Sequence, residues 1–167
     1  DTKQDLSGIY LRKIQHEGCT QSSNEEVEEI QKLIDTLKEH YALKIGEATR
    51  NIEDEDFIII APYNAQVKLL QSKLNDAIKV GTVDRFQGQE APFAIYSMAA
   101  STAEDAPKGI NFLLDKNRLN VAISRAQICS IVVCSKYLLN TKCNTIEQMK
   151  LLDIFASLEN YNVSHVI

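Results

Sequence analysis

The segment VGTVDRFQGQE, residues 80–90, combines residue types that could bind a phosphate group. Thr82 supplies a hydroxyl that suits a phosphate oxygen, and Asp84 follows it near the end of an expected strand. Gly88 has no Cβ, so backbone amides can approach an anion there, and Glu90 could orient a water molecule or an arginine. The same residues also fit a tight connection between two strands with solvated polar side chains, which composition alone favours.

A second segment, NRLNVAISRAQ at 117–127, carries two arginines seven residues apart. Seven residues are two helical turns, so Arg118 and Arg125 are expected on one face of a helix. Arg125 comes at the end of this helix, directly before an apolar run. An arginine at a rigid helix end can reach across a cleft and neutralise charge developing on a γ-phosphate. The alternative is a pair of surface arginines whose stems cover apolar neighbours.

The third segment, APYNAQ at 61–66, lies where an apolar strand would run into a helix. Tyr63 offers an aromatic face, Gln66 offers an amide, and a helix N-terminus adds partial positive charge. A tyrosine in such a place is more often a packed ring, so this segment alone indicates little.

Alternating apolar patterns predict the elements that must hold these segments in place. Continuous apolar runs predict buried strands, and spacings of three and four predict amphipathic helices. The expected strands cover 8–14, 57–63, 80–84, 93–99 and 130–135. The expected helices cover 24–40, about 116–126 and 146–159, with one more beginning at Asn64. Strand and helix alternate, which predicts an α/β domain with a mainly parallel sheet.

Local signals refine these boundaries. Ser22 and Ser23, three residues before Glu25 and Glu26, predict overlapping capping boxes for the first helix. Asn64 is expected to cap the second helix, and the polar stretch 44–56 is expected to be a connection. Ligands bind beyond the carboxyl ends of strands in parallel sheets. We therefore expect function at 62–66, 84–90 and 97–101.

The composition fits one domain that covers residues 1–167, with 44% hydrophobic and 25% charged residues. A net charge of −5 confines any phosphate binding to one part of the surface. No apolar run reaches the roughly 20 residues of a membrane helix. The first residue is not Met, which fits a piece of a longer protein. Four cysteines without a CxxC pair, and three scattered histidines, favour neither disulfides nor a metal site and suit a reducing cytoplasm.

Taken together and in this order, the segments resemble superfamily-one helicases of the branch that includes the nonsense-mediated-decay RNA helicase. PYNAQ resembles their motif IV region, GTVDRFQGQE their motif V and RLNVAISRA their motif VI. HEGCTQSSNEEVEEI, at 16–30, resembles the segment that opens their second motor domain. The resemblance covers about 9–135. It implies a three-layer RecA-like domain of the P-loop NTPase type, the second and C-terminal motor of a longer helicase.

The resemblance also implies roles for individual residues. ATP with Mg would lie between this domain and an N-terminal RecA-like domain of the same protein, which would hold the metal. Arg125 would be the arginine finger, Glu90 would act beside it, and Gly88, Gln87 and Arg118 would approach the nucleotide. The candidates for binding single-stranded nucleic acid, DNA more than RNA, are Thr82, Asp84, Tyr63, Gln66 and Ser97.

Two features depart from the family's pattern. No GxxxxGK[ST] occurs, so the chain alone is expected to bind ATP poorly and hydrolyse none. Relatives often carry an arginine near the start of the first helix, where this chain has Gln21, Ser22 and Ser23. We assign no second γ-phosphate contact there. More narrowly, 95–113 and 143–155 resemble bacterial members in which a RecB-family nuclease precedes the helicase.

Two other functions compete with half of an ATP-driven motor. One is a non-catalytic interaction module that kept the motor fold. The other is a flavodoxin-like phosphoacceptor domain, for which Asp84 would be the acceptor. The last is the weakest, because Asp54 and Asp56 precede their strand and would lie at the wrong edge of the sheet.

Overall fold

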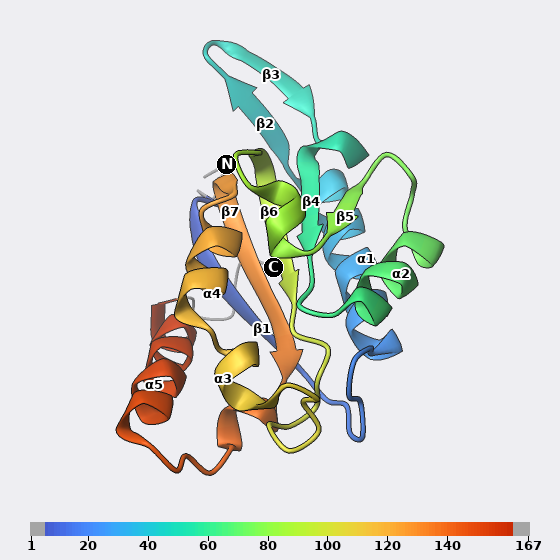
Figure 1. Ribbon diagram of the computed structural model, residues 1–167. Coiled ribbons are helices and arrows are strands. Elements are labelled where there is room, and N and C mark those ends of the chain that lie inside the picture. The colour runs from blue at the N-terminus through green and yellow to red at the C-terminus, as the bar shows by residue number, and fades with distance from the viewer. Residues whose placement is uncertain (1–5, 162–167) are drawn as a thin grey trace.

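The computed structural model describes residues 6–161, with side chains to residue 157, around one central sheet (Figure 1). The strand order is β1-β7-β6-β4-β5. All four neighbouring pairs are parallel. The strands are β1 (Gly8–Ile14), β4 (Phe57–Ile60), β5 (Lys79–Gly81), β6 (Ala91–Ser97) and β7 (Ala126–Ser135). The predicted parallel α/β sheet is therefore confirmed.

Helices cover both faces of the sheet, because its central strands are apolar on both sides. Phe57 and Ile59 belong to one buried cluster with residues of α1 (Asn24–His40) and α2 (Asn64–Lys73). Ile58 and Ile60 belong to a second cluster on the opposite face. That cluster includes residues of α3 (Gly109–Leu113), α4 (Lys116–Ile123) and α5 (Ile146–Tyr161). This is the three-layer arrangement of a RecA-like domain.

Both predicted helix caps differ from the structure. The Ser23 side chain accepts from the Glu26 backbone N–H at 3.1 Å, which is half of a capping box. The reciprocal bond is absent, because the Ser23 N–H donates to Gln66 Oε1 at 2.8 Å. The cap predicted at Asn64 is wrong, since α2 begins with Tyr63 as its N-cap and without a side-chain cap bond.

The stretch 44–56, predicted as a connection, contains a hairpin that projects from the end of the sheet where β4 begins (Figure 1). Strand β2 (Ala42–Ile45) pairs antiparallel with β3 (Ala48–Asn51). The turn uses Gly46 at φ +62°. Of the hairpin's eight strand residues only Leu43 is buried, so the alternating pattern that predicts a strand is almost absent. A 3₁₀ turn, η1 (Asp54–Asp56), then leads into β4.

Several expected boundaries differ from the structure, and two of them affect the site. The strand expected at 80–84 ends at Gly81, and Val83–Phe86 form a 3₁₀ turn, η2. The helix expected at 116–126 ends at Ile123. The short helix α3 was not predicted. Within residues 6–161, no helix combines the length and apolar character that a membrane crossing requires.

Candidate functional site

The predicted site residues separate into two groups at opposite ends of the sheet. Residues 84–90 were expected at the carboxyl ends of strands. However, β5 and β6 both run parallel to β4, so the connection between them must cross a face of the sheet. Glu90 therefore lies at the amino end of β6, and Arg125 lies beside it at the amino end of β7. The Ala91 N–H donates to the Arg125 carbonyl at 3.0 Å and joins these two segments.

The side chain of Arg125 lies against the turn that contains Gly88. Its Nη1 donates to the carbonyls of Phe86 and Gln89, each at 3.4 Å. Its Nε donates to the Val121 carbonyl at 3.1 Å. The two long Nη1 bonds go to neutral acceptors, which an anion could replace. The motif VI arginine and the motif V turn therefore form one unit.

The turn itself is open to a ligand. Gly88 has φ +79°, and a Cβ built there would have no atom within 4 Å. A residue with a Cβ would thus be disfavoured at this position by the positive φ, and not by a steric clash. Gln87 and Glu90 are exposed on either side, and Arg125 is half-buried. The exposed backbone of Gly88, one cation and one carboxylate are therefore accessible at this end of the sheet.

Arg118 does not join this group. Helix α4 ends at Ile123, so Arg125 lies outside it, and the prediction that both arginines share one helical face is wrong. Arg118 lies in the first turn of α4, roughly 10 Å along the helix axis from Arg125. Its guanidinium carbon is 4.3 Å from the centroid of the Phe112 ring.

The second group surrounds the carboxyl ends of β4, β5 and β6. Thr82 directly follows β5 and is half-buried, and Asp84 is exposed in η2. Tyr63 is 5% exposed, whereas Gln66 and Ser97 are fully buried. Two of the five predicted strand-binding residues therefore cannot touch a ligand in this conformation. The surface role predicted for Gln66 and Ser97 is therefore wrong for this conformation.

Gln66 and Ser97 belong instead to a buried network centred on Glu26. The Gln66 amide donates to Ser97 Oγ at 2.9 Å, and that hydroxyl donates to Glu26 Oε2. The Ala99 N–H donates to the same carboxylate oxygen at 3.0 Å. Ala99 has φ +67°, an uncommon conformation for a residue with a Cβ. The carboxylate thus fixes the chain where it leaves β6.

The network continues through a histidine. Glu26 Oε1 is 2.9 Å from His16 Nε2, and His16 Nδ1 is 2.7 Å from Ser101 Oγ. Ser101 Oγ also accepts from the Cys19 N–H at 2.9 Å. All these bonds are satisfied if His16 is neutral with its proton on Nε2 and Ser101 donates to Nδ1.

Serine, histidine and glutamate in a row resemble a hydrolase triad. Here the side chains of His16 and Glu26 are 0% exposed, and so is Ser101. No substrate reaches Ser101, so the network supports the fold. Sequence reasoning missed His16, Glu26 and Ser101 because no short motif connects residues 85 positions apart.

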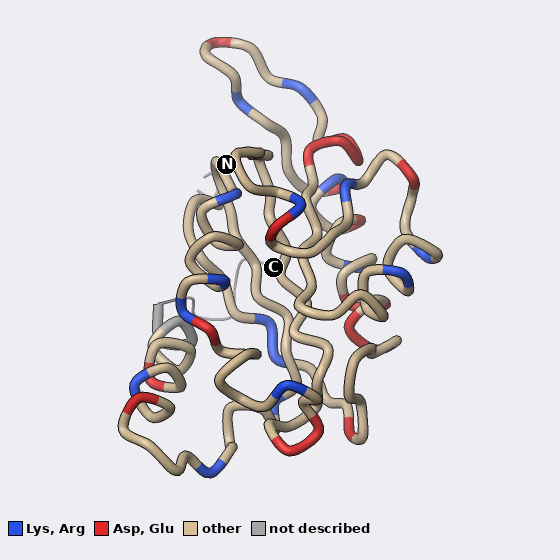
Figure 2. The backbone as a smooth tube through the Cα atoms, in the orientation of Figure 1, with Lys and Arg blue, Asp and Glu red and all other residues tan. Residues whose placement is uncertain are grey.

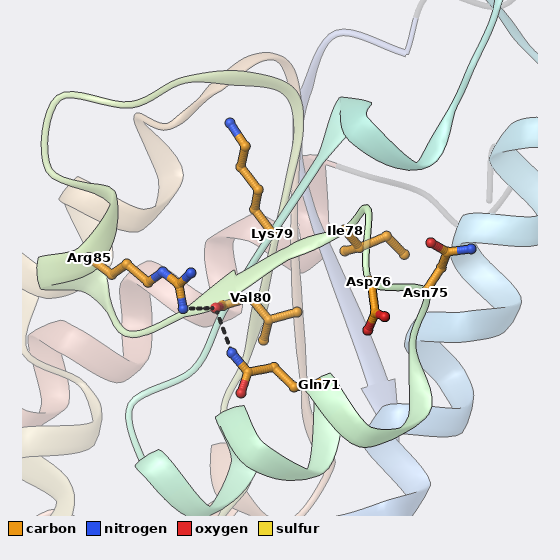
Figure 3. Close-up of a pocket in the computed structure, with 7 residues that line it drawn as sticks. All are labelled: Gln71, Asn75, Asp76, Ile78, Lys79, Val80 and Arg85. Carbon is orange, nitrogen blue, oxygen red and sulfur yellow. Dashed lines mark hydrogen bonds between the residues drawn. The ribbon is translucent and has the colours of Figure 1, made fainter.

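A pocket of about 270 Å³ lies at the free edge of β5 (Figure 3). Two of its polar side chains bond to the same backbone carbonyl. Gln71 Nε2 and Arg85 Nη1 both donate to the Val80 carbonyl, at 3.3 and 3.1 Å. These bonds cap an edge-strand carbonyl that could otherwise pair with another chain. In the described part of the chain, no group of three His, Cys, Asp or Glu residues could hold a metal ion.

Comparison with known proteins identifies the family of this chain. A family described as an AAA domain matches residues 9–137, from β1 to just beyond β7. The "Probable RNA helicase armi" of Drosophila melanogaster is 34% identical over 111 residues, which cover 62% of this chain and 9% of that protein. This chain belongs to the superfamily-one helicases.

Other relatives of this helicase domain have names that refer to DNA. The "DNA polymerase alpha-associated DNA helicase A" of Schizosaccharomyces pombe is 38% identical over 77 residues, covering 44% of this chain and 11% of that protein. The "DNA-binding protein SMUBP-2" of Rattus norvegicus is 33% identical over 92 residues, covering 53% and 9%. The helicase domain thus spans about a tenth of the length of these relatives, and belongs to their nonsense-mediated-decay branch.

Proposed function

We propose that this domain is the second, C-terminal motor domain of an ATP-dependent helicase or translocase, acting in the cytoplasm. One observation carries the proposal: Arg125 and the open turn at Gly88 form a single unit at the amino ends of β6 and β7. A structural arginine would need no accessible turn beside it. An arginine finger does, because its guanidinium must meet a phosphate that the turn also approaches.

The residues at this end fit the phosphates of ATP. The backbone of Gln87 and Gly88 can approach them, since no atom lies within 4 Å of the position that a Gly88 side chain would take. Arg125 would leave its two carbonyl acceptors and neutralise the charge that develops during phosphoryl transfer. Glu90 would orient the attacking water or the arginine. ATP supplies the transferable phosphoryl group, and its Mg would be held by the first motor domain.

The other end of the sheet would face the nucleic acid. Thr82 and Asp84 are accessible there and are our candidates for contact with a single strand. Tyr63, Gln66 and Ser97 would support that edge from inside. We propose DNA as the track, although relatives are named for both RNA and DNA. Arg118 was grouped with the nucleotide on resemblance, but its place over Phe112 favours the strand-binding end.

A non-catalytic interaction module is the second candidate. The lack of a GxxxxGK[ST] segment in these 167 residues is compatible with this candidate, as it is with a motor whose phosphate cradle lies in another domain. Such a module would keep the fold without turnover, so hydrolysis by the full-length protein decides between the two functions.

The test is ATP hydrolysis by the full-length protein, with and without single-stranded DNA or RNA. We expect Arg125→Ala to lower kcat by about 10³-fold or more, because the finger acts on the transition state. Strand affinity should stay nearly unchanged. Arg12→Ala is the control, because it removes the same charge from β1 beside Val133, near the carboxyl end of β7 and away from the Gly88 turn. Equal losses of kcat and strand affinity in Arg125→Ala would contradict the assignment, and absence of any turnover would favour the interaction module.

A further inference from the structure

Two cations surround an aromatic ring that lies outside the motifs. Arg118 begins the RLNVAISRA string, whereas Lys108 and Phe112 belong to none of the three strings. Lys108 Nζ is 4.5 Å from the centroid of the Phe112 ring, and Arg118 Cζ is 4.3 Å from it. Tyr63 packs against the same ring, with centroids 5.7 Å apart and a tilt of 40°. Phe112 is only half-buried and Lys108 is exposed, so the cluster can be reached from solvent.

The cations of this cluster are not neutralised by acidic side chains. Elsewhere Lys38 pairs with Asp54 and Arg50 with Asp56. Neither Lys108 nor Arg118 forms an ion pair with any side chain that the structure describes, residues 6–157. Acidic and basic residues are intermixed along this chain of net charge −5, so attraction of an anion here depends on these two cations and not on the overall charge (Figure 2).

The acidic neighbours of the cluster are occupied by their own loops. The Asp115 carboxylate accepts from the Arg118 backbone N–H at 2.8 Å and so caps α4. The Asp105 carboxylate accepts from Thr102 Oγ1 at 2.8 Å. Their negative charge weakens the attraction for an anion, but they leave the donor groups of both cations available.

Tyr63, which packs against the Phe112 ring, carries an unpaired polar group. Its hydroxyl is the only buried side-chain nitrogen or oxygen without a hydrogen-bond partner among the described residues. Burial raises the pKa of Tyr63, so the hydroxyl stays protonated as a donor that lacks an acceptor. An unpaired buried donor destabilises the free protein unless a partner arrives.

The position of the cluster selects the kind of partner. Tyr63 follows the carboxyl end of β4, and Thr82 follows the carboxyl end of the adjacent strand β5. The cluster is therefore at the end of the sheet away from Arg125. An aromatic ring with neighbouring cations is the combination that single-stranded nucleic acids use, through base stacking and phosphate contacts.

We propose that Lys108, Phe112 and Arg118, backed by Tyr63, form a binding site for single-stranded nucleic acid. The two cations contact phosphates of the strand, and the ring that they uncover packs against a base. The site deepens the proposed function and rests on it. It assigns Arg118 to strand binding instead of nucleotide binding, and it adds Lys108 and Phe112 to the residues that contact the strand.

The test measures how tightly the full-length protein binds single-stranded DNA and RNA oligonucleotides at several salt concentrations. For the Lys108→Ala, Arg118→Ala double variant we expect affinity to fall about tenfold or more. The slope of log affinity against log salt should decrease by about 1.4, since each lost phosphate contact removes about 0.7 on single strands. Phe112→Leu keeps an apolar side chain but no ring, and should lose about fivefold or more through stacking.

Two controls separate the possible outcomes. Lys32→Ala removes one exposed charge on α1, on the other face of the sheet, and should leave affinity unchanged. If the wild type binds and the double variant binds as tightly as Lys32→Ala, the inference fails while the proposed function stands. If the wild type binds no strand, the proposed function fails. Loss of strand-independent hydrolysis in the double variant would place the cluster against the first motor domain and overturn the inference.

Tyr63→Phe tests the unpaired hydroxyl in the same assays. Without the strand, this variant should melt at the same or a higher temperature than the wild type, since it loses only an unsatisfied donor. With the strand it should bind severalfold more weakly. Unchanged affinity would show that the hydroxyl has no part in the site.

Discussion

Glu26 shows how one residue can satisfy a local pattern and still serve the tertiary structure. Its position in the first turn of α1 is that of a capping-box acid, and its backbone N–H does bond to Ser23. Its carboxylate, however, is buried, accepts from Ser97 and Ala99, and lies 2.9 Å from His16 Nε2. A buried charge persists only when it is paired. The side chain of Glu26 therefore bonds to these distant partners and does not return to the helix N-terminus as a capping-box acid would.

We expect Glu26→Ala to lower the free energy of unfolding of the 167-residue chain by about 3–5 kcal/mol, because it leaves several buried donors without an acceptor. Urea denaturation at neutral pH measures this change. Glu28→Ala is the matched control, since it removes an exposed carboxylate from the same helix. Equal effects of the two substitutions would show that the network adds no stability.

At the scale of elements, one ion pair holds the β2–β3 hairpin to the start of β4. Both terminal nitrogens of Arg50 donate to the Asp56 carboxylate at 2.6 Å, and the Glu53 N–H donates to it at 2.8 Å. The hydrogen bonds with Arg50 lower the pKa of Asp56 below its usual value. The hairpin has little core of its own, so its orientation depends on this pair.

Because the folded pKa of Asp56 is depressed, its contribution is present above the usual Asp pKa of about 3.9 and lost as pH falls through the folded value. We therefore expect Asp56→Asn to lower stability at pH 7. The difference between variant and wild type should shrink steadily below about pH 4. Denaturation midpoints across this range provide the measurement. A difference that is constant with pH would show that the charge of Asp56 does not matter.

At the scale of the whole molecule, the two candidate sites lie at opposite ends of one rigid sheet. Strand β6, of seven residues, separates them by roughly 20 Å. Helix α4 also links them, with Arg118 in its first turn and Arg125 just beyond its last. In the motor that we propose, binding at one end would influence the other through movement of the whole domain against the first motor domain.

A single domain of this kind should be inactive alone. We expect the isolated 167-residue chain to hydrolyse no ATP. We also expect it to bind single strands in the non-specific range, with Kd about 10⁻⁴ M or weaker, since its net charge is −5. Fluorescence anisotropy in physiological salt measures the affinity. Micromolar binding would show that the cations at the carboxyl edge act without the first domain.

The sequence by itself determined the elements whose patterns are local. Apolar runs located all five strands of the sheet, and helical spacing located α1 and α5. These patterns are local, because the buried face of a strand or helix is formed by apolar residues at a fixed short spacing. The motif strings also indicated the helicase family, which the matched residues 9–137 confirm. The hairpin was missed because its short strands bury almost nothing.

Only the tertiary structure decided which candidates meet. It brought Arg125 to the 86–89 turn, 36 residues away at Gln89, and moved both to the amino ends of their strands. It buried Gln66 and Ser97 around Glu26, and it placed Arg118 over Phe112. The physical reason is that a polar side chain is buried or exposed according to partners from distant segments, whose approach depends on how the strands are ordered and connected.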